Sequence, residues 1–187
     1  MAFDPVSRLS TPVSRTGRFG VWGADRSELS RRLGCDDFLE NPDQVLIRAT
    51  EVDAPAGVLY RWLTQMRVAP YSYDWLDNLG RKSPGHLIEG MDEPAVGQRI
   101  ATIFRLVALE KDRSLTMLHD GPVFGTTVIT YLTEPVTDST SRLFGRLLVK
   151  YRRNPLGTGL SLVLPAGDLV MMRRQMLNFA RLAATSA

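Results

Sequence analysis

The fold is decided by the stretch Val45-Leu46-Ile47-Arg48-Ala49-Thr50-Glu51-Val52, which runs directly into Asp53-Ala54-Pro55. The first eight residues are rich in apolar and β-branched side chains, as is typical of a strand. Proline suits the first turn of a helix, because its missing N–H would have no partner there. Apolar residues then recur at helical spacing up to Met66, so we expect a helix with one apolar face after the strand.

A second short helix is expected after Pro70. Within residues 71–80, Trp75, Leu76 and Leu79 share one face of a helix, and Gly80 is a suitable C-terminal stop. Residues 81–97 are rich in proline, glycine and charge, which predicts a long loop. A loop of this length inside a compact domain is usually functional or mobile.

Extended segments dominate the next part of the chain, at 99–104, 106–109, 114–119, 126–133 and 142–152. Their short linkers predict an antiparallel meander. The last segment alternates apolar with basic side chains, which indicates a sheet with one dry face and one wet face. We interpret the basic face as solvated, and contact with an anionic membrane or a dimer partner is the alternative. Its residues are Arg142, Arg146, Lys150, Arg152 and Arg153.

The C-terminal segment predicts a long amphipathic helix. Residues 154–167 contain two prolines and three glycines and are interpreted as a turn-rich connector, after which Asp168 is expected to cap the helix. Apolar residues then follow at steps of three and four, from Leu169 to Ala183. The dry face of the sheet is the only large surface against which this helix can pack.

The residues before the first strand fall into two parts. Residues 1–20 mix arginine with serine, threonine and proline, and predict a flexible basic arm. An arm that packs on a neighbouring subunit or touches a polyanion is the alternative. Residues 21–44 form a preamble in which Asp25 caps a short helix through Leu33 and Gly34 ends it. We expect this preamble to pack on the main body, so that residues 21–187 make one domain.

Composition limits the class of protein. A chain of 187 residues with 44% hydrophobic residues fits one globular domain, and a net charge of +3 does not require nucleic acid. The single cysteine, Cys35, allows no intramolecular disulfide and fits a reducing compartment. We find neither a secretory signal nor a stretch of about eighteen apolar residues, and so expect a cytoplasmic protein.

Few residues suggest metal or nucleophilic chemistry. His86 and His119 have no ligand-like spacing with each other or with Cys35, so we expect no metal and no cofactor. The chain has no Gly-x-Ser-x-Gly elbow and no glycine-rich phosphate loop. No aromatic residues interleave with the cations of the basic strand face, which argues against nucleic acid as a partner.

The predicted order of elements is the α+β helix-grip layout: a strand, two short helices, antiparallel strands and a long closing helix. The turn Asp53-Ala54-Pro55, with the apolar helix after it, resembles the first strand-to-helix turn of SRPBCC proteins (START-like, polyketide cyclase/dehydrase-like). Residues 71–81 and 167–175 are similar to segments of one uncharacterised bacterial branch of that superfamily. The resemblance covers about residues 20–185.

The resemblance implies a curved antiparallel sheet wrapped around the C-terminal helix, with a cavity between them. Members of the superfamily bind lipids, sterols, polyketides or other apolar ligands, and some are cyclases. It carries over no catalytic residue.

Four aromatic residues, Trp62, Tyr71, Tyr73 and Trp75, are the leading candidates for a ligand site. They either pack the core where the two short helices meet the sheet, or line the mouth of an apolar cavity. Met66, Met172 and Met176 would add flexible walls, unless they too are plain core.

Catalysis in an apolar pocket would need ionisable groups inside it. The candidates are His119, Arg105, Tyr131, Tyr73 and Glu110. The alternatives are that His119 is solvated, that Arg105 pairs with a surface acid, and that Tyr131 is half-buried packing.

Three functions follow. The first is binding of a small apolar ligand, such as a lipid or polyketide, in a cavity between the sheet and the C-terminal helix. The second is an enzyme of the cyclase, aromatase or dehydratase type. The third is a structural or protein-interaction module that uses the basic face or the N-terminal arm, and peripheral membrane contact and a homodimer stay open.

Overall fold

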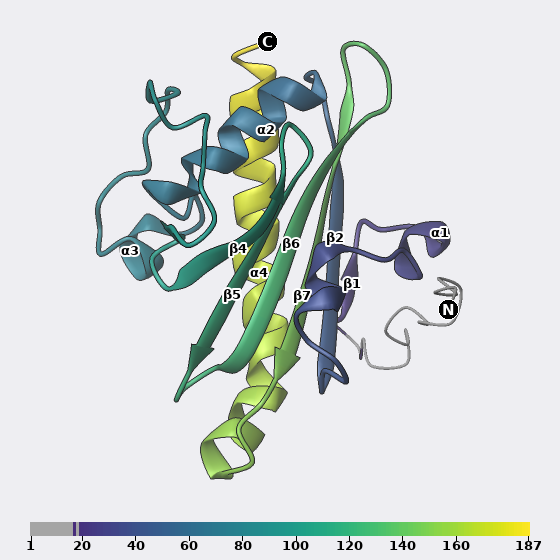
Figure 1. The fold of residues 1–187 in the computed structure, drawn as a ribbon, viewed down its shortest axis with the longest axis vertical. Coiled ribbons are helices and arrows are strands. Elements are labelled where there is room, and N and C mark those ends of the chain that lie inside the picture. Colours follow the sequence, from purple (N-terminus) through teal and green to yellow (C-terminus); the bar gives the residue numbers. More distant parts are fainter. Residues whose placement is uncertain (1–16, 18) are drawn as a thin grey trace, which may run out of the picture.

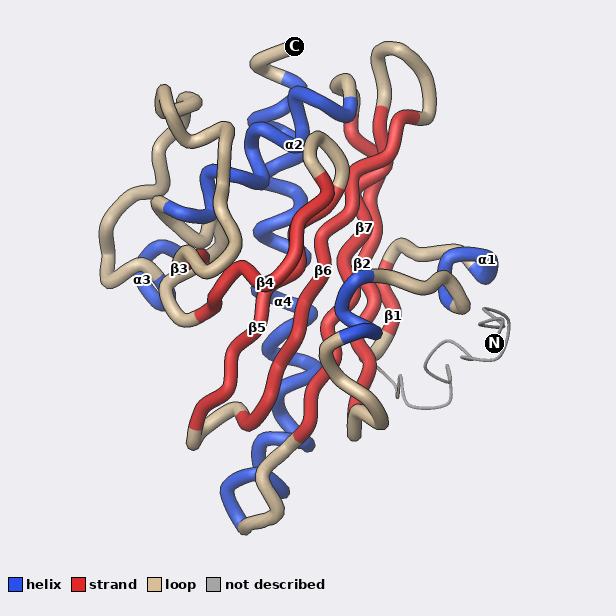
Figure 2. The backbone as a smooth tube through the Cα atoms, in the orientation of Figure 1, coloured by secondary structure: helices blue, strands red, loops and turns tan. Residues whose placement is uncertain are grey.

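The computed structural model describes residue 17 and residues 19–187 (Figure 1). Residues 1–16 and 18, which make up most of the predicted arm, lie outside the described residues. One sheet in the order β1-β2-β7-β6-β5-β4-β3 is crossed on one face by the long helix α4, Pro155–Ala184. Figure 2 shows this helix behind the strands and running along them.

The strands form an antiparallel meander, with one exception at the edge. Strand β1 pairs in parallel with β2, whereas every other neighbouring pair is antiparallel. The first long strand and the last one, β2 and β7, lie side by side over nine paired positions. The bounds are β1 Val21–Trp22, β2 Gln44–Val52, β3 Arg99–Ile100, β4 Phe104–Glu110, β5 Ser114–Gly121, β6 Gly125–Pro135 and β7 Ser141–Lys150.

Short helices occupy the two connections that precede the meander. Before β2 lie α1 (Arg26–Leu29) and the 3₁₀ turn η2 (Gly34–Asp37). After β2 come α2 (Ala56–Thr64), the 3₁₀ turn η3 (Gln65–Arg67) and α3 (Asp74–Asp77). The strand, the short helices, the meander and the closing helix confirm the predicted helix-grip fold.

The inner face of the sheet is covered by α2 and α4. The aromatic side chains of Trp62, Tyr71 and Phe179 meet at the centre of this layer. The ring centroids of Trp62 and Tyr71 are 6.0 Å apart, and those of Tyr71 and Phe179 are 5.2 Å apart. They are fully or almost fully buried among the inward-facing residues of the strands. We call this packed layer the inner core. It includes the contact between the C-terminal helix and the sheet that the amphipathic pattern predicted.

The start of the closing helix differs from the prediction. Residues 154–167 were expected to be a connector, but α4 begins at Pro155. Asn154 caps it by accepting a hydrogen bond from Gly157 N–H at 2.7 Å, and Pro155 occupies the first turn. These are start signals for a helix, and the helix continues through Pro165 despite the N–H that proline lacks.

Asp168 was expected to cap this helix and instead lies in its middle. There it forms an ion pair with Arg48 of β2, with 2.8 Å between Oδ2 and Nη2. The Arg48 side chain is fully buried and also donates to the carbonyl oxygen of Gly20. Burial raises the pKa of Asp168 to about 6, although the nearby guanidinium opposes that change.

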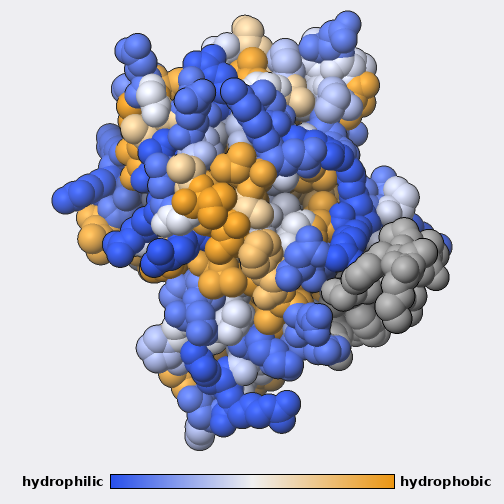
Figure 3. Space-filling view, viewed as in Figure 1, coloured by the Kyte–Doolittle hydropathy of each residue, from blue (hydrophilic) through white to orange (hydrophobic). Residues whose placement is uncertain are grey.

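The prediction that the face of the sheet opposite α4 is exposed to water is wrong for the central part of that face, and apolar side chains gather at the middle of this side of the molecule (Figure 3). Residues of the preamble cover it and form a second apolar cluster, the outer core. Gly34 lies so close to the sheet that a Cβ there would be 2.4 Å from Thr116 Oγ1, so its role is close packing rather than helix termination. The outer core comprises Leu33, Cys35, Val45, Ile47, Ala49, Val128, Leu132, Phe144 and Leu148.

Four of the five cations of the basic strand face have carboxylate partners, and the fifth, Arg153, is exposed. Arg146, only 1% exposed, pairs with Asp36 at 3.0 Å, and Arg142 pairs with Glu28 at 2.8 Å. Lys150 and Arg152 pair with Asp43 and Asp120. An anionic membrane or nucleic acid would have to compete with these carboxylates.

Two smaller expectations also need correction. The helix expected from Asp25 to Leu33 ends at Leu29, although Asp25 does cap it. The second short helix, α3, covers only Asp74–Asp77, so Leu79 lies outside it, and the three residues predicted to share one helix face, Trp75, Leu76 and Leu79, are 74%, 53% and 89% exposed.

Helix α4 is long and apolar enough to cross a membrane by length and composition, contrary to the sequence-based expectation that no segment is. Only 17% of its most apolar stretch of 18 residues is buried. The core helix of a water-soluble protein can pass the same test, so this property alone does not place the chain in a membrane.

Candidate functional site

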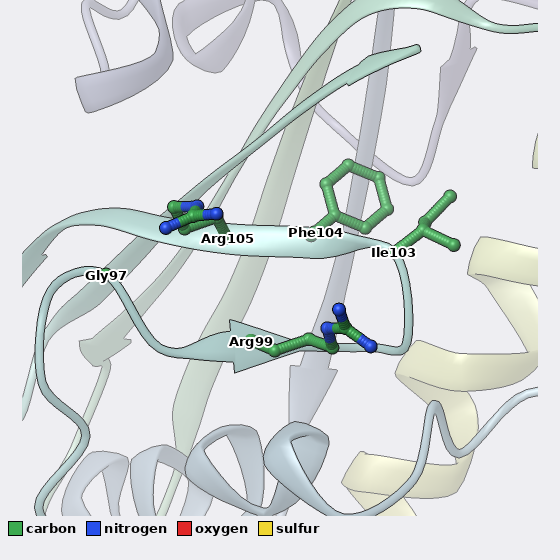
Figure 4. A pocket seen from close by; sticks show the side chains of 5 residues that line it. All are labelled: Gly97, Arg99, Ile103, Phe104 and Arg105. Atoms are coloured by element: carbon green, nitrogen blue, oxygen red, sulfur yellow. The ribbon is translucent and has the colours of Figure 1, made fainter.

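A pocket of about 300 Å³ lies at the β3–β4 hairpin, at one edge of the sheet (Figure 4). Its walls are two arginines, two apolar side chains and a glycine backbone: Arg99, Arg105, Ile103, Phe104 and Gly97. The predicted cavity between the sheet and the C-terminal helix is a different place. The described pocket thus combines cationic and apolar surface on one short hairpin.

The turn of this hairpin is held in an unusual conformation. Ala101 and Thr102 both have positive φ angles, 43° and 68°. Thr102 is β-branched, and a β-branched residue rarely adopts this conformation. The Ala101 N–H donates to the carbonyl oxygen of Met66 at 2.7 Å, and Ile100 is buried below the turn. The hairpin is therefore fixed to η3, which positions the pocket walls.

The two arginines lie directly opposite each other in the hairpin register. Both are exposed, and neither guanidinium has a hydrogen bond or an ion pair with any residue from 19 to 187. Like charges in cross-strand pairs are unfavourable. Several other arginines of the sheet have carboxylate partners, so the pair Arg99 and Arg105 is a cationic site that the described part of the chain leaves uncompensated.

His119 of β5 contacts two residues of the pocket wall, Ile103 and Phe104. Its Nδ1–H donates to the carbonyl oxygen of Ile103 at 3.0 Å, which assigns the proton to Nδ1 because a carbonyl only accepts. Its ring contacts those of Phe104 and Phe124 edge-on, at 5.9 Å and 6.2 Å between centroids. The histidine supports the apolar wall and the turn, and its Nε2 lies close to Gly121, where an added Cβ would be 2.6 Å from it.

Most of the predicted ligand-site residues pack the inner core instead of lining this pocket. Buried together are Trp62, Met66, Tyr71, Tyr131, Met172 and Met176. The hydroxyl of Tyr131 donates to Oε1 of Gln175, whose amide in turn donates to the carbonyl oxygen of Pro70. Burial raises the pKa of Tyr71 to about 12, so this phenol stays protonated at neutral pH.

The other candidates are spread over the surface. Tyr73 lies under the guanidinium of Arg174, at 5.9 Å from the ring centre, and Trp75 is exposed to solvent. Glu110 pairs with Arg113 at 2.9 Å. Of the predicted set, only Arg105 lines the pocket, and His119 contacts the pocket wall at Ile103 and Phe104.

Sequence reasoning missed Arg99, Ile103 and Phe104. The segment 99–104 was interpreted as one strand, whereas the chain turns back at residues 101–103. The cross-strand arginine pair can be recognised only once the position of that turn is known. The sequence does not reveal the turn, because its two residues with positive φ angles are not glycines.

The described residues contain no group of three His, Cys, Asp or Glu side chains that could hold a metal ion. The pocket walls likewise carry donors and no carboxylate. Its chemistry suits an anion better than a cation.

No family model matches the chain, and no curated protein matches it. Among solved structures, the chain is similar to protein MLL2253 from Mesorhizobium loti, at 15% identity over 77% of this chain and 99% of that one, with a TM-score of 0.46. It is also similar to the di-domain ARO/CYC BexL from the BE-7585A biosynthetic pathway, at 17% identity over 74% of this chain and 45% of that one, with a TM-score of 0.46. A third is Ara h 8.0201, at 9% identity over 76% and 96%, with a TM-score of 0.45. The strand order and the position of α4 define the helix-grip fold.

Proposed function

We propose that this protein binds a small molecule with an apolar body and an anionic group, at the pocket of the β3–β4 hairpin. The observation that carries the proposal is the uncompensated cross-strand pair Arg99 and Arg105. A carboxylate or a phosphate would relieve the repulsion between these cations. Phe104 and Ile103, which is 48% exposed, would contact the apolar body.

Binding is favoured over the cyclase or dehydratase alternative. Proton transfer at neutral pH needs a group that exchanges its proton there, and arginine holds its proton throughout. His119, which contacts Phe104 of the pocket wall, uses its Nδ1–H to hold the turn. The walls can orient and neutralise a ligand, which is what a binding protein requires.

A pair of fluorescent probes tests the charge requirement. We expect 1-anilinonaphthalene-8-sulfonate to bind more tightly than N-phenyl-1-naphthylamine, which lacks the sulfonate. Replacing both arginines by glutamine should weaken binding of the sulfonate probe about tenfold or more, because charged hydrogen bonds contribute about 1.5–3 kcal/mol. The neutral probe should be unaffected.

Arg81→Gln is the matched control, since Arg81 is also exposed and lies outside the pocket. Equal affinity for the two probes, or an equal loss in the control, would overturn the proposal. Native mass spectrometry of the purified protein can then search for a co-purified acid.

A further inference from the structure

The outer side of α4 carries a stripe of exposed apolar residues at a constant spacing of seven. Leu156, Val163, Val170 and Leu177 are 52%, 62%, 55% and 42% exposed. We call them the α4 stripe. Two residues further along a helix lie on nearly the opposite side, and accordingly Pro165 and Met172, two residues after members of the stripe, are buried. From Val163 to Leu177 the stripe therefore faces away from the sheet.

A spacing of seven is informative because seven residues make almost two full turns. Such a stripe drifts only about 20° per repeat, and two helices that wind around each other keep it in contact. From residue 156 to residue 177 the stripe is about 32 Å long at 1.5 Å per residue. No such regularity is needed to pack against the helix's own sheet, which the other side of α4 already contacts.

The charges on α4 restrict the direction of pairing. Residues 155–167 contain no charged side chain, and the second half of the helix carries Asp168 and three arginines. Asp168 points inward to Arg48. Parallel pairing would place the arginines of two copies at the same level. Antiparallel pairing places each arginine-bearing half beside the uncharged half of the other copy, and it also opposes the helix dipoles.

The midpoint of the stripe falls between Ala166 and Gly167. A Cβ on Gly167 would meet nothing within 4 Å, so the surface here is open. Small residues at a crossing point let two helix backbones approach closely. A two-fold axis at this position would bring the same patch of both copies together.

We propose that two copies of this chain associate through the α4 stripe, with their α4 helices antiparallel. A bilayer surface fits the same residues less well. Helices that lie on membranes carry lysine or arginine along the polar side of the apolar face, and residues 155–167 have none. The inference is independent of the pocket.

Light scattering after size exclusion, at a series of protein concentrations, tests the association. We expect a dimer for the full chain. Val163→Asp should raise its dissociation constant about 100-fold or more, because each copy would bury an unpaired carboxylate. Val136→Asp is the matched control, since Val136 is equally exposed, at 62%, but lies in the β6–β7 turn. Circular dichroism confirms that both variants fold.

Single cysteines test the direction. The only native thiol, Cys35, is fully buried. Antiparallel pairing predicts that a mixture of Leu156→Cys and Leu177→Cys chains forms mixed disulfides under mild oxidation, whereas either variant alone forms few.

A monomer at every concentration, a dimer that tolerates Val163→Asp, or homodisulfides of Leu156→Cys alone would each overturn the proposal. So would flotation of a monomer with phosphatidylglycerol vesicles that Val163→Asp abolishes.

Discussion

The inner and outer faces of the sheet are both buried, yet by different kinds of structure. Two regular helices cover the inner face, where Trp62, Tyr71 and Phe179 pack in an apolar layer. Short turns of residues 23–40 cover the outer face, and ion pairs surround a smaller apolar cluster there. A regular helix repeats its apolar residues at a fixed spacing and can be predicted from the sequence. An irregular segment such as residues 23–40 has no such spacing.

The ion pairs of the outer face tie the preamble to strands far along the chain. Arg31 pairs with Glu134, and Arg142 with Glu28. These pairs lie at the margin of the outer core and are partly exposed, so each contributes modestly. The pair Arg146 and Asp36 differs, because both side chains are buried. The outer layer therefore depends on one buried pair and on Phe144 more than on its surface charges.

The largest expected effect is the loss of stability when one buried phenylalanine in each layer is replaced by alanine. Phe179→Ala should lower the free energy of unfolding by about 4–5 kcal/mol and Phe144→Ala by about 3 kcal/mol. Both are fully buried, but the short turns over Phe144 can settle into the space left behind more easily than α4 can. Urea unfolding followed by circular dichroism measures both. Equal losses would contradict the distinction between the layers.

Arg146→Met sharpens the comparison within the outer layer. The change removes the cation of a buried pair and should cost about 3 kcal/mol. Arg142→Met serves as the control, because its partly exposed pair should contribute about 1 kcal/mol or less. Unfolding by urea again gives the values. A similar small loss in both variants would show that Asp36 does not need Arg146.

The smallest expected effect is a difference in pH dependence. The Arg142 guanidinium holds the pKa of Glu28 below its usual 4.5, and Arg31 does the same for Glu134. Their stabilisation is therefore complete above pH 4.5 and is lost as the pH falls through the lowered values. Asp168 behaves oppositely: its pKa is raised from 3.8 to about 6, so its contribution is complete below pH 3.8 and is lost as the pH rises through 6.

Cys35 reports on the outer layer in this experiment. It is buried in the outer core, and burial raises the pKa of its thiol to about 12, so labelling requires the preamble to open. Labelling by 4,4′-dithiodipyridine, normalised to a cysteine peptide, should be about two- to fivefold faster near pH 4 than near pH 6.5. Glu28→Gln should reduce this pH effect. A rate independent of pH would contradict the proposed role of these carboxylates.

The candidate site could be predicted only in part, and for a definable reason. Arg105 and His119 were named from their residue types; Arg105 lines the pocket, and His119 contacts the wall residue Phe104. Arg99 and Ile103 were not named, because they meet Arg105 only through a turn with two non-glycine residues at positive φ. The aromatic candidates were equally compatible with core packing, and the structure places Trp62 and Tyr71 in the core.

The order of elements, the antiparallel meander and the contact between α4 and the inner face could be predicted from the amino-acid sequence, because each follows from local periodicity. Tertiary contacts alone settled that Gly34 and Arg146 are covered, that Asp168 pairs with Arg48, and that Arg99 and Arg105 face each other without a partner among the described residues. Those outcomes depend on which distant segments meet. Local spacing constrains a residue's neighbours along the chain, and it does not determine those across the fold.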